Sequence, residues 1–475
     1  MSAPHRLNAL ENAFLQLDSR GSPFRVGAVL QFERGPLTTP SGDLDVARLR
    51  QYFAALLDRL PEYRQRIRRI PLLGHPVWVD VDPFDIDHHV KLTRVAAPGS
   101  AAELHESVSR IICSPLPHSR PPWQIWFVDG LAGDRFAMVT VVHHALVDGV
   151  AGVRLLEAML RGVPDAIIPA RTPSPPQRTR APALLAAELI HRARGLLALR
   201  DRLGDSPRQL LPALAEMIAR GLRPASNAGL NRRRVSPDRL VTTWQMPLDE
   251  IKRVRRHFDA TVNDVLLTVA SGALHRFLAR RGVDVARLAD FRALVPASTH
   301  LASDRAVSGN RISMLLTQLP VDEADPDRRI ARVRATTRAL KRTSRQAAAG
   351  EFLTGLSDVT APSLMPALLG LLLSRRAFNI VITDIPGPPF PLYLLGCRLD
   401  SFHPIINLWP GHTLGLAFFS YAGTLYCGLH ADREAIPELD GLSADLEASF
   451  AELRAAVPAP APVPVPEPAR IPAVA

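Results

Sequence analysis

Two adjacent histidines, His143 and His144, begin an HHxxxDG pattern in the first third of the chain. Histidine can take up and return a proton near neutral pH because its unperturbed pKa is about 6.5. The preceding residues 135–142 are apolar and rich in β-branched side chains, which predicts a buried strand. The following residues 150–160 have the apolar spacing of a helix. The histidines therefore lie where a strand turns into a helix.

Successive side chains of an extended chain point to opposite faces, so His143 and His144 are not expected to share one metal ion or one substrate proton. One of them is expected to carry proton-transfer chemistry. Asp148 is expected to hold the turn by capping backbone N–H groups or by pairing with an arginine, and Gly149 permits tight backbone geometry. A core histidine pair beside a capped helix is the alternative. No metal site is expected, because no third ligand lies at a recognisable spacing.

Three further side chains are candidates for substrate contact. A short turn at 132–134 separates the strand 121–128 from the histidine strand, and hairpin pairing would bring Trp123 or Trp126 near the catalytic turn. A tryptophan that only fills the core is an equally good interpretation. Asn263 and Asp264 begin a predicted helix, where capping is their ordinary role. A second histidine pair, His88-His89, lacks the aspartate-glycine turn, and we expect it to be structural.

The composition is that of a globular protein, with 475 residues, 47% of them hydrophobic and 22% charged. This length suits two to three domains. The three cysteines are far apart and odd in number, which predicts neither a disulfide framework nor a zinc motif and suits a reducing cytoplasm. The first residues lack the apolar core of a signal peptide, and no apolar run is long enough to span a bilayer.

The net charge of +11 is concentrated in one segment. Residues 171–240 contain fourteen arginines and five Asp or Glu residues, a net charge of +9. Arginines alternate with leucines between residues 184 and 200, which is typical of an amphipathic helix that lies on a membrane surface. A solvated linker helix is the alternative. Nucleic acid is not an expected partner, because interleaved aromatic residues and known nucleic-acid motifs are missing from the segment.

Changes in composition divide the chain into four parts. We predict an N-terminal α/β lobe over 1–165, a basic, proline-rich helical linker over 166–237, a second α/β lobe over 238–455 and a disordered proline- and alanine-rich tail over 456–475. Within the first lobe, residues 84–90 alternate like a strand.

Together these features resemble the bacterial wax ester synthase/acyl-CoA:diacylglycerol acyltransferase (WS/DGAT) family. More distantly they resemble other HHxxxDG proteins, namely chloramphenicol acetyltransferase, carnitine acyltransferases and peptide-synthetase condensation domains. The resemblance rests on segments 7–14, 23–27, 119–123, 143–149, 263–264, 295–296, 309–311, 386–388 and 414–432. Two positions depart from the family pattern: Pro122 stands where leucine is usual, and Thr383-Asp384 stands where Ser-Asn is usual.

The resemblance implies an α/β fold of two chloramphenicol acetyltransferase-like lobes with mixed sheets, and a tunnel between the lobes. It implies transfer of an acyl group from long-chain acyl-CoA to diacylglycerol or a fatty alcohol, which makes triacylglycerol or wax esters. His144 is then the general base and acid, His143 supports it, Asp148 is structural, and Asn263 is a candidate oxyanion donor. Acyl-CoA is a co-substrate, and no cofactor is expected.

Three points stay open in this interpretation. The enzyme is expected in the cytoplasm, peripherally bound to the inner face of the plasma membrane or to lipid droplets. A glycolipid or condensation-type acyltransferase would use the same pattern, and so would a non-catalytic lipid-surface protein that kept the fold. A hydrolase with an acyl-serine is not expected, because no GxSxG elbow occurs.

Overall fold

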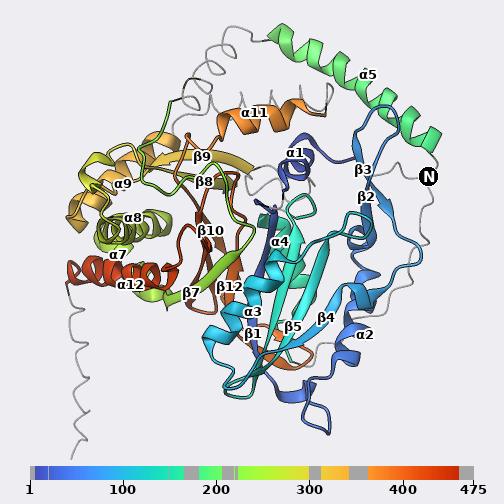
Figure 1. The fold of residues 1–475 in the computed structure, drawn as a ribbon, viewed down its shortest axis with the longest axis horizontal. Coiled ribbons are helices and arrows are strands. Elements are labelled where there is room, and N and C mark those ends of the chain that lie inside the picture. The colour runs from blue at the N-terminus through green and yellow to red at the C-terminus, as the bar shows by residue number, and fades with distance from the viewer. Residues whose placement is uncertain are drawn as a thin grey trace, which may run out of the picture.

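The computed structural model describes residues 6–19, 21–147, 149–164, 181–205, 219, 223–298, 312–341 and 362–458. These residues form two mixed sheets that lie side by side, with helices packed on them (Figure 1). The first sheet has the order β11-β12-β1-β6-β5-β4. Its strands are β1 (Arg25–Glu33), β4 (Val90–Arg94), β5 (Trp123–Leu131), β6 (Arg135–His143), β11 (Tyr393–Leu394) and β12 (Cys397–Ile405). A separate hairpin pairs β2 (Gln65–Arg69) with β3 (Pro76–Asp80).

The second sheet has the order β7-β14-β13-β10-β8-β9. Its strands are β7 (Arg239–Pro247), β8 (Arg292–Ser298), β9 (Ile312–Gln318), β10 (Ile380–Pro386), β13 (Leu414–Tyr421) and β14 (Thr424–Asp432). The β13–β14 hairpin turns across Ala422 and Gly423. Parallel pairing of β10 with β8 and β13 makes this sheet mixed, and parallel pairing of β4 with β5 does the same in the first sheet.

Helices cover the sheets where their apolar faces meet buried strand residues. The first sheet is covered by α2 (Val46–Leu57) and α4 (Gly149–Met159) on one face and by α3 (Ala101–Cys113) on the other. The second sheet is covered by α7 (Leu248–His257), α8 (Val262–Arg280), α9 (Pro326–Lys341) and α12 (Leu439–Ala455). At one edge of the molecule lie α1 (Ala9–Leu17), α5 (Ala181–Asp205) and α11 (Leu364–Leu372) (Figure 1). Short 3-10 helices occupy Gly35–Leu37, Pro61–Arg64, Ile86–His88 and Val285–Arg287.

The two lobes are not continuous in sequence. The predicted second lobe, 238–455, contributes β11 and β12 to the first sheet, where β12 pairs antiparallel with β1. At Gly428 on β14 the two sheets come together, because a side chain there would collide with the carbonyl group of Pro404 on β12. The β12 segment therefore fastens one lobe to the other.

One local prediction was wrong, and another was borne out in part. Residues 84–90 are not a strand: a 3-10 helix over Ile86–His88 precedes β4, with Asp85 accepting a hydrogen bond from the Asp87 N–H. Such a local aspartate turn competes with the strand that the alternating pattern suggests. Helix α8 has Thr261 as its N-cap, so Asn263 and Asp264 lie inside its first turn.

The structure describes only part of the predicted linker, 166–237. Helix α5 occupies part of 166–237 and packs Leu184 against Ile70 and Val77 of the β2–β3 hairpin. The predicted disordered tail lies almost wholly outside the described residues.

Acid should destabilise this fold, because burial lowers the pKa of several histidines. The pKa falls to about 3 or about 4 at His75, His89, His143, His403, His412 and His430. Each of these takes up a proton on unfolding, where the ordinary pKa is 6.5, so stability is lost as the pH falls below about 6.5. Burial raises the pKa of Asp384 to about 6, and this single carboxyl works in the opposite direction.

We therefore expect the melting temperature to fall by at least about 5 °C between pH 7 and pH 5. Scanning calorimetry in a pH series measures this change, and the range from pH 7.5 to 8.5, where these histidines do not titrate, provides the baseline. A melting temperature that stays constant or rises at pH 5 would contradict the role of the buried neutral histidines.

Candidate active site at the junction of the lobes

The HHxxxDG turn is held by backbone hydrogen bonds to two other segments and by one within the turn. The His143 N–H donates to the Pro122 carbonyl at 2.9 Å, and the His144 N–H donates to the Phe24 carbonyl at 2.8 Å. The Leu146 N–H closes the turn on the His143 carbonyl at 2.9 Å. These bonds fix the end of the strand, so the backbone that carries both imidazoles is held in place.

His143 points into the protein and is fixed as a hydrogen-bond acceptor. Its side chain is buried, and Nδ1 accepts a hydrogen bond from the Ala145 N–H at 3.0 Å. Burial, with the nearby His118, His144 and Arg25, lowers the pKa of His143 to about 3. The proton of the neutral ring is then on Nε2, which lies 3.8 Å from Oδ2 of Asp18. This environment keeps His143 neutral and ties it to the turn, which suits a supporting residue.

His144 is only half-buried, and its ring lies against an aromatic cluster. Its centroid is 4.5 Å from that of Phe14 on α1. Phe14 in turn contacts Phe24 and Trp409, at 5.5 Å and 6.3 Å between ring centroids. The same apolar cluster includes Val381 of β10, in the second sheet. His144 thus lies at the junction of the two lobes.

The remaining candidate residues have mixed outcomes. Asp148 lies outside the described residues, and Gly149 is the first residue of α4. The predicted β5–β6 hairpin is present, with Trp123 opposite Val142. Trp123 is buried, however, and its Nε1–H donates to the Tyr63 carbonyl at 2.7 Å. These contacts make Trp123 a core residue of the first lobe, which was the alternative interpretation.

Asp264 uses both carboxylate oxygens in structural hydrogen bonds. Oδ2 accepts from the Thr261 N–H at 2.8 Å, and Oδ1 accepts from the Thr337 hydroxyl at 2.7 Å. Asp264 therefore closes a capping box and joins α8 to α9, which leaves it poorly placed to bind a substrate. The neighbouring Asn263 is half-buried in the same turn and remains a candidate.

Several residues around the turn were not assigned a role from the sequence. Phe14, Asp18 and Phe24 come from the N-terminal segment, and Trp409 comes from the loop after β12. Segments 7–14 and 23–27 carried the resemblance, but spacing alone did not reveal that Phe14 contacts His144 and that Phe24 packs on Phe14. Among the described residues, no group of three or more His, Cys, Asp or Glu side chains is arranged to hold a metal ion.

The structure is a two-lobed mixed α/β fold with the HHxxxDG turn at the junction of the lobes. The first condensation domain of the CDA synthetase shares this fold, with a TM-score of 0.60, 17% identity and coverage of 96% of this chain and 98% of that one.

The chain belongs to the WS/DGAT family. The wax ester synthase/diacylglycerol acyltransferase catalytic domain matches residues 7–266, and the WS/DGAT C-terminal domain matches residues 308–454. A putative diacylglycerol O-acyltransferase of Mycobacterium tuberculosis is 30% identical, over 95% of this chain and 90% of that protein. The O-acyltransferase WSD of Acinetobacter baylyi is 28% identical, over 93% of this chain and 95% of that protein. The wax ester synthase/diacylglycerol acyltransferase of Marinobacter aquaeolei VT8 superposes with a TM-score of 0.69 at 25% identity, over 95% and 99% of the two chains.

The adjacent residues Asn263 and Asp264 allow a direct comparison of a substrate role with a structural one. Asp264→Ala removes the capping carboxylate and leaves the Thr337 hydroxyl without its acceptor, so we expect a loss of about 1–3 kcal/mol in the free energy of unfolding. Asn263→Ala should change stability by less than about 0.5 kcal/mol, as at most sites without such contacts. Urea denaturation of both variants measures the difference. Equal stability losses would mean that Asn263 has a structural role like that of Asp264.

Proposed function

We propose that the protein transfers an acyl group from long-chain acyl-CoA to the hydroxyl of diacylglycerol or of a long-chain alcohol, making triacylglycerol or wax esters. In this proposal His144 is the general base and then the general acid, and no bound cofactor takes part. The observation that carries the proposal is the difference between the two histidines. His143 is buried, neutral and bonded to its own turn, whereas His144 is half-buried at the lobe junction against Phe14.

The chemistry needs no covalent enzyme intermediate, because a thioester is already activated. His144 takes the proton from the acceptor hydroxyl as its oxygen attacks the thioester carbonyl carbon. The tetrahedral oxyanion then collapses, the carbon–sulfur bond breaks, and the protonated His144 gives its proton to the leaving thiolate. The products are an ester and free CoA, and the imidazole returns to its starting state.

Apolar surroundings suit this reaction and its substrates. The cluster of Phe14, Phe24, Phe378 and Trp409 lies beside His144 and offers an apolar wall to an acyl chain. An amide donor such as Asn263 would stabilise the oxyanion if it reaches the carbonyl oxygen. The names of the relatives, diacylglycerol O-acyltransferase and wax ester synthase, support this substrate class.

A condensation-type or glycolipid acyltransferase is the second candidate within enzymes. Asp384 motivates it, because the usual asparagine at this position in the family pattern is replaced by a carboxyl whose pKa burial raises to about 6. Such a group changes the polarity around the acceptor if it lines the tunnel. A parallel assay with an amine and a sugar-lipid acceptor distinguishes this activity from the main proposal.

His144→Ala should reduce the rate of ester formation by about 10²–10⁴-fold with little change in the melting temperature. His143→Ala should reduce the rate less and should lower the melting temperature, because the buried Nδ1 contact with the Ala145 N–H is lost. Purified protein with palmitoyl-CoA and either diolein or hexadecanol, followed by thin-layer detection of ester and free CoA, measures both effects. Near-wild-type turnover by folded His144→Ala protein would remove the proposed base.

We further propose that the enzyme works while bound peripherally to a lipid surface, the cytoplasmic membrane face or a lipid droplet. The edge of the molecule that carries α1, next to His144, also carries α5 and the β2–β3 hairpin (Figure 1). On α5, Leu189, Ile190 and Leu197 are 53%, 52% and 64% exposed. Leu72, at the hairpin tip, is 95% exposed. In the part of the chain that is described, no helix is long and apolar enough to cross a membrane.

Flotation with liposomes tests this binding. The wild-type protein should float with anionic vesicles at low salt and less at high salt, because basic residues contribute about 1 kcal/mol each near an anionic surface. A variant with Leu189, Ile190 and Leu197 changed to Gln should float less in both salts. Leu92→Gln, which changes an exposed leucine of β4, is the matched control and should float like wild type. Equal flotation of all three proteins would show that α5 does not bind the surface.

A further inference from the structure

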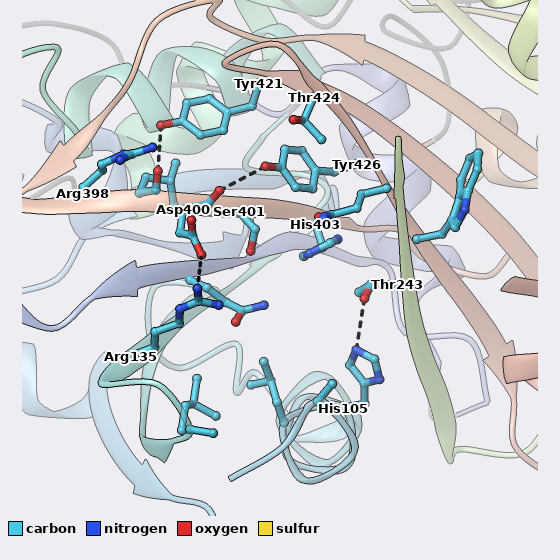
Figure 2. A pocket seen from close by; sticks show the side chains of 18 of the residues that line it. His105, Arg135, Thr243, Arg398, Asp400, Ser401, His403, Tyr421, Thr424 and Tyr426 are labelled. Carbon is cyan, nitrogen blue, oxygen red and sulfur yellow. Dashed lines mark hydrogen bonds and ion pairs between the residues drawn. The ribbon is translucent and has the colours of Figure 1, made fainter. Parts of the chain in front are cut away.

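A cavity lies between the lobes, at the opposite end of β6 from the histidine turn. It has a volume of about 810 Å³ and is lined by α3 and Arg135 of the first lobe, by Thr243 of the second lobe and by β12. Figure 2 shows these side chains converging from both lobes. Arg135 begins β6 and His143 ends it, so eight strand steps of about 3.3 Å, roughly 26 Å, separate the cavity from the turn.

Part of the first sheet between the two sites carries a buried apolar cluster. On the α3 side of the first sheet, Val29, Val139, Val141 and Ile405 belong to one buried cluster. These residues lie along the strands that run from the cavity toward His143. None of the residues that line the cavity belongs to the aromatic cluster around His144.

Two buried polar side chains of β12 line this cavity, and each has one polar atom without a hydrogen-bond partner among the described residues. Ser401 and His403 are 8% and 5% exposed, and alternation along β12 places both on the same face of the strand. Among the described residues, neither the Ser401 hydroxyl nor His403 Nδ1 has a hydrogen-bond partner. Figure 2 shows both groups directed into the cavity. A buried polar group without a partner destabilises a protein by about 1–3 kcal/mol, so a bound ligand that supplies hydrogen bonds would explain their presence.

The charged side chains of the cavity favour an anion. Arg135 and Arg398 line it and are about half-exposed, with Asp400 as the lining carboxylate. Arg135 lies 3.3 Å from Asp400, and Arg398 lies 4.0 Å from Glu33. Each guanidinium has five N–H donors, so one carboxylate contact leaves donors for a further group.

Helix α3 adds a weaker attraction for an anion. Its N-terminal residues Ser100 and Ala101 also line the cavity, where the positive end of the helix dipole lies. The capping box formed with Glu103 already occupies part of this terminus. The arginines are therefore the main anion-binding groups.

We propose that this cavity binds a phosphate-bearing small molecule. Arg135 and Arg398 pair with the phosphate oxygens, and Ser401 and His403 hydrogen-bond the more deeply buried part of the ligand. Burial lowers the pKa of His403 to about 3, although a backbone hydrogen bond to Cys427 acts in the opposite direction, so the ring is neutral and its unpartnered Nδ1 accepts a hydrogen bond from the ligand. The volume suits a nucleotide-sized ligand, since small-molecule sites span about 300–1,000 Å³. The phosphate comes either from the CoA part of an acyl donor or from a free nucleotide.

Calorimetric titration of the full chain with 3′,5′-ADP, CoA and inorganic phosphate tests the site. The wild-type protein should bind 3′,5′-ADP, and Arg135→Gln with Arg398→Gln should weaken binding at least about tenfold. Asp400→Asn removes the competing carboxylate and should tighten binding severalfold. Arg287→Gln, which changes an exposed arginine paired with Asp284, is the matched control and should bind like wild type. Thermal melting of each variant checks that it is folded.

Ser401→Ala separates ligand binding from a structural role. Its hydroxyl has no partner in the described protein, so its removal should leave the melting temperature of the free protein unchanged or higher while weakening 3′,5′-ADP binding a few-fold. Absence of 3′,5′-ADP, CoA and phosphate binding by wild type would overturn the proposal. So would wild-type affinity in the folded double arginine variant.

Two further measurements identify the source of the phosphate and keep this site distinct from the catalytic proposal. His144→Ala protein should bind 3′,5′-ADP as wild type does, whatever its activity. If the phosphate belongs to the acyl donor, the double arginine variant should raise KM for palmitoyl-CoA with kcat unchanged. If it belongs to a free nucleotide, KM should stay constant, and 3′,5′-ADP should alter the rate of the wild type but not of the variant.

Discussion

The backbone pairing of β12 with β1 is the contact on which the geometry of the molecule depends. β1 lies between β6 and β12, so its carbonyl and amide groups are satisfied on both sides. Just before β1, the Phe24 carbonyl accepts the N–H of His144. β1 and β6 can approach closely at this point because Gly27 has no side chain. A Cβ atom there would collide with the Thr140 carbonyl on β6. The position of the HHxxxDG turn is thus set by a strand that the second half of the chain holds in place.

Burial gives the two adjacent histidines different chemistry. At the end of β6 one side chain enters the protein, loses water and becomes a neutral acceptor for the N–H of Ala145. The next one leaves the strand and rests on Phe14 at the lobe junction. Both residues are histidines, so their chemical identity does not distinguish them. The difference is the direction in which each side chain leaves the end of the strand. The same desolvation acts on His403 of β12, whose neutral ring faces a cavity and not a turn.

Local patterns predicted the local structure well. The short turn at 132–134 between two strand-like runs identified the β5–β6 hairpin, because this hairpin pairs neighbours in the sequence. The pairing of β12 with β1 joins residues more than 360 positions apart, and no periodicity in either strand reveals a partner so distant. The same limit applies to Trp409 and Phe24, whose rings meet 5.3 Å apart. Trp123 was ambiguous for another reason: spacing predicted its position opposite Val142, but the face of the sheet that it occupies decides whether it meets substrate or core.

The return of β12 to the first sheet has a consequence for cutting this chain into pieces. The matched catalytic domain ends at residue 266, well before β11 and β12. A fragment with that boundary would leave one edge of the nine-residue strand β1 open, with its N–H and C=O groups unpaired beside an apolar surface. Open edges of this kind recruit strands from other molecules and lead to aggregation. The two lobes therefore have to be kept together when the chain is expressed or recombined, although the family's sequence patterns divide it into two matched domains.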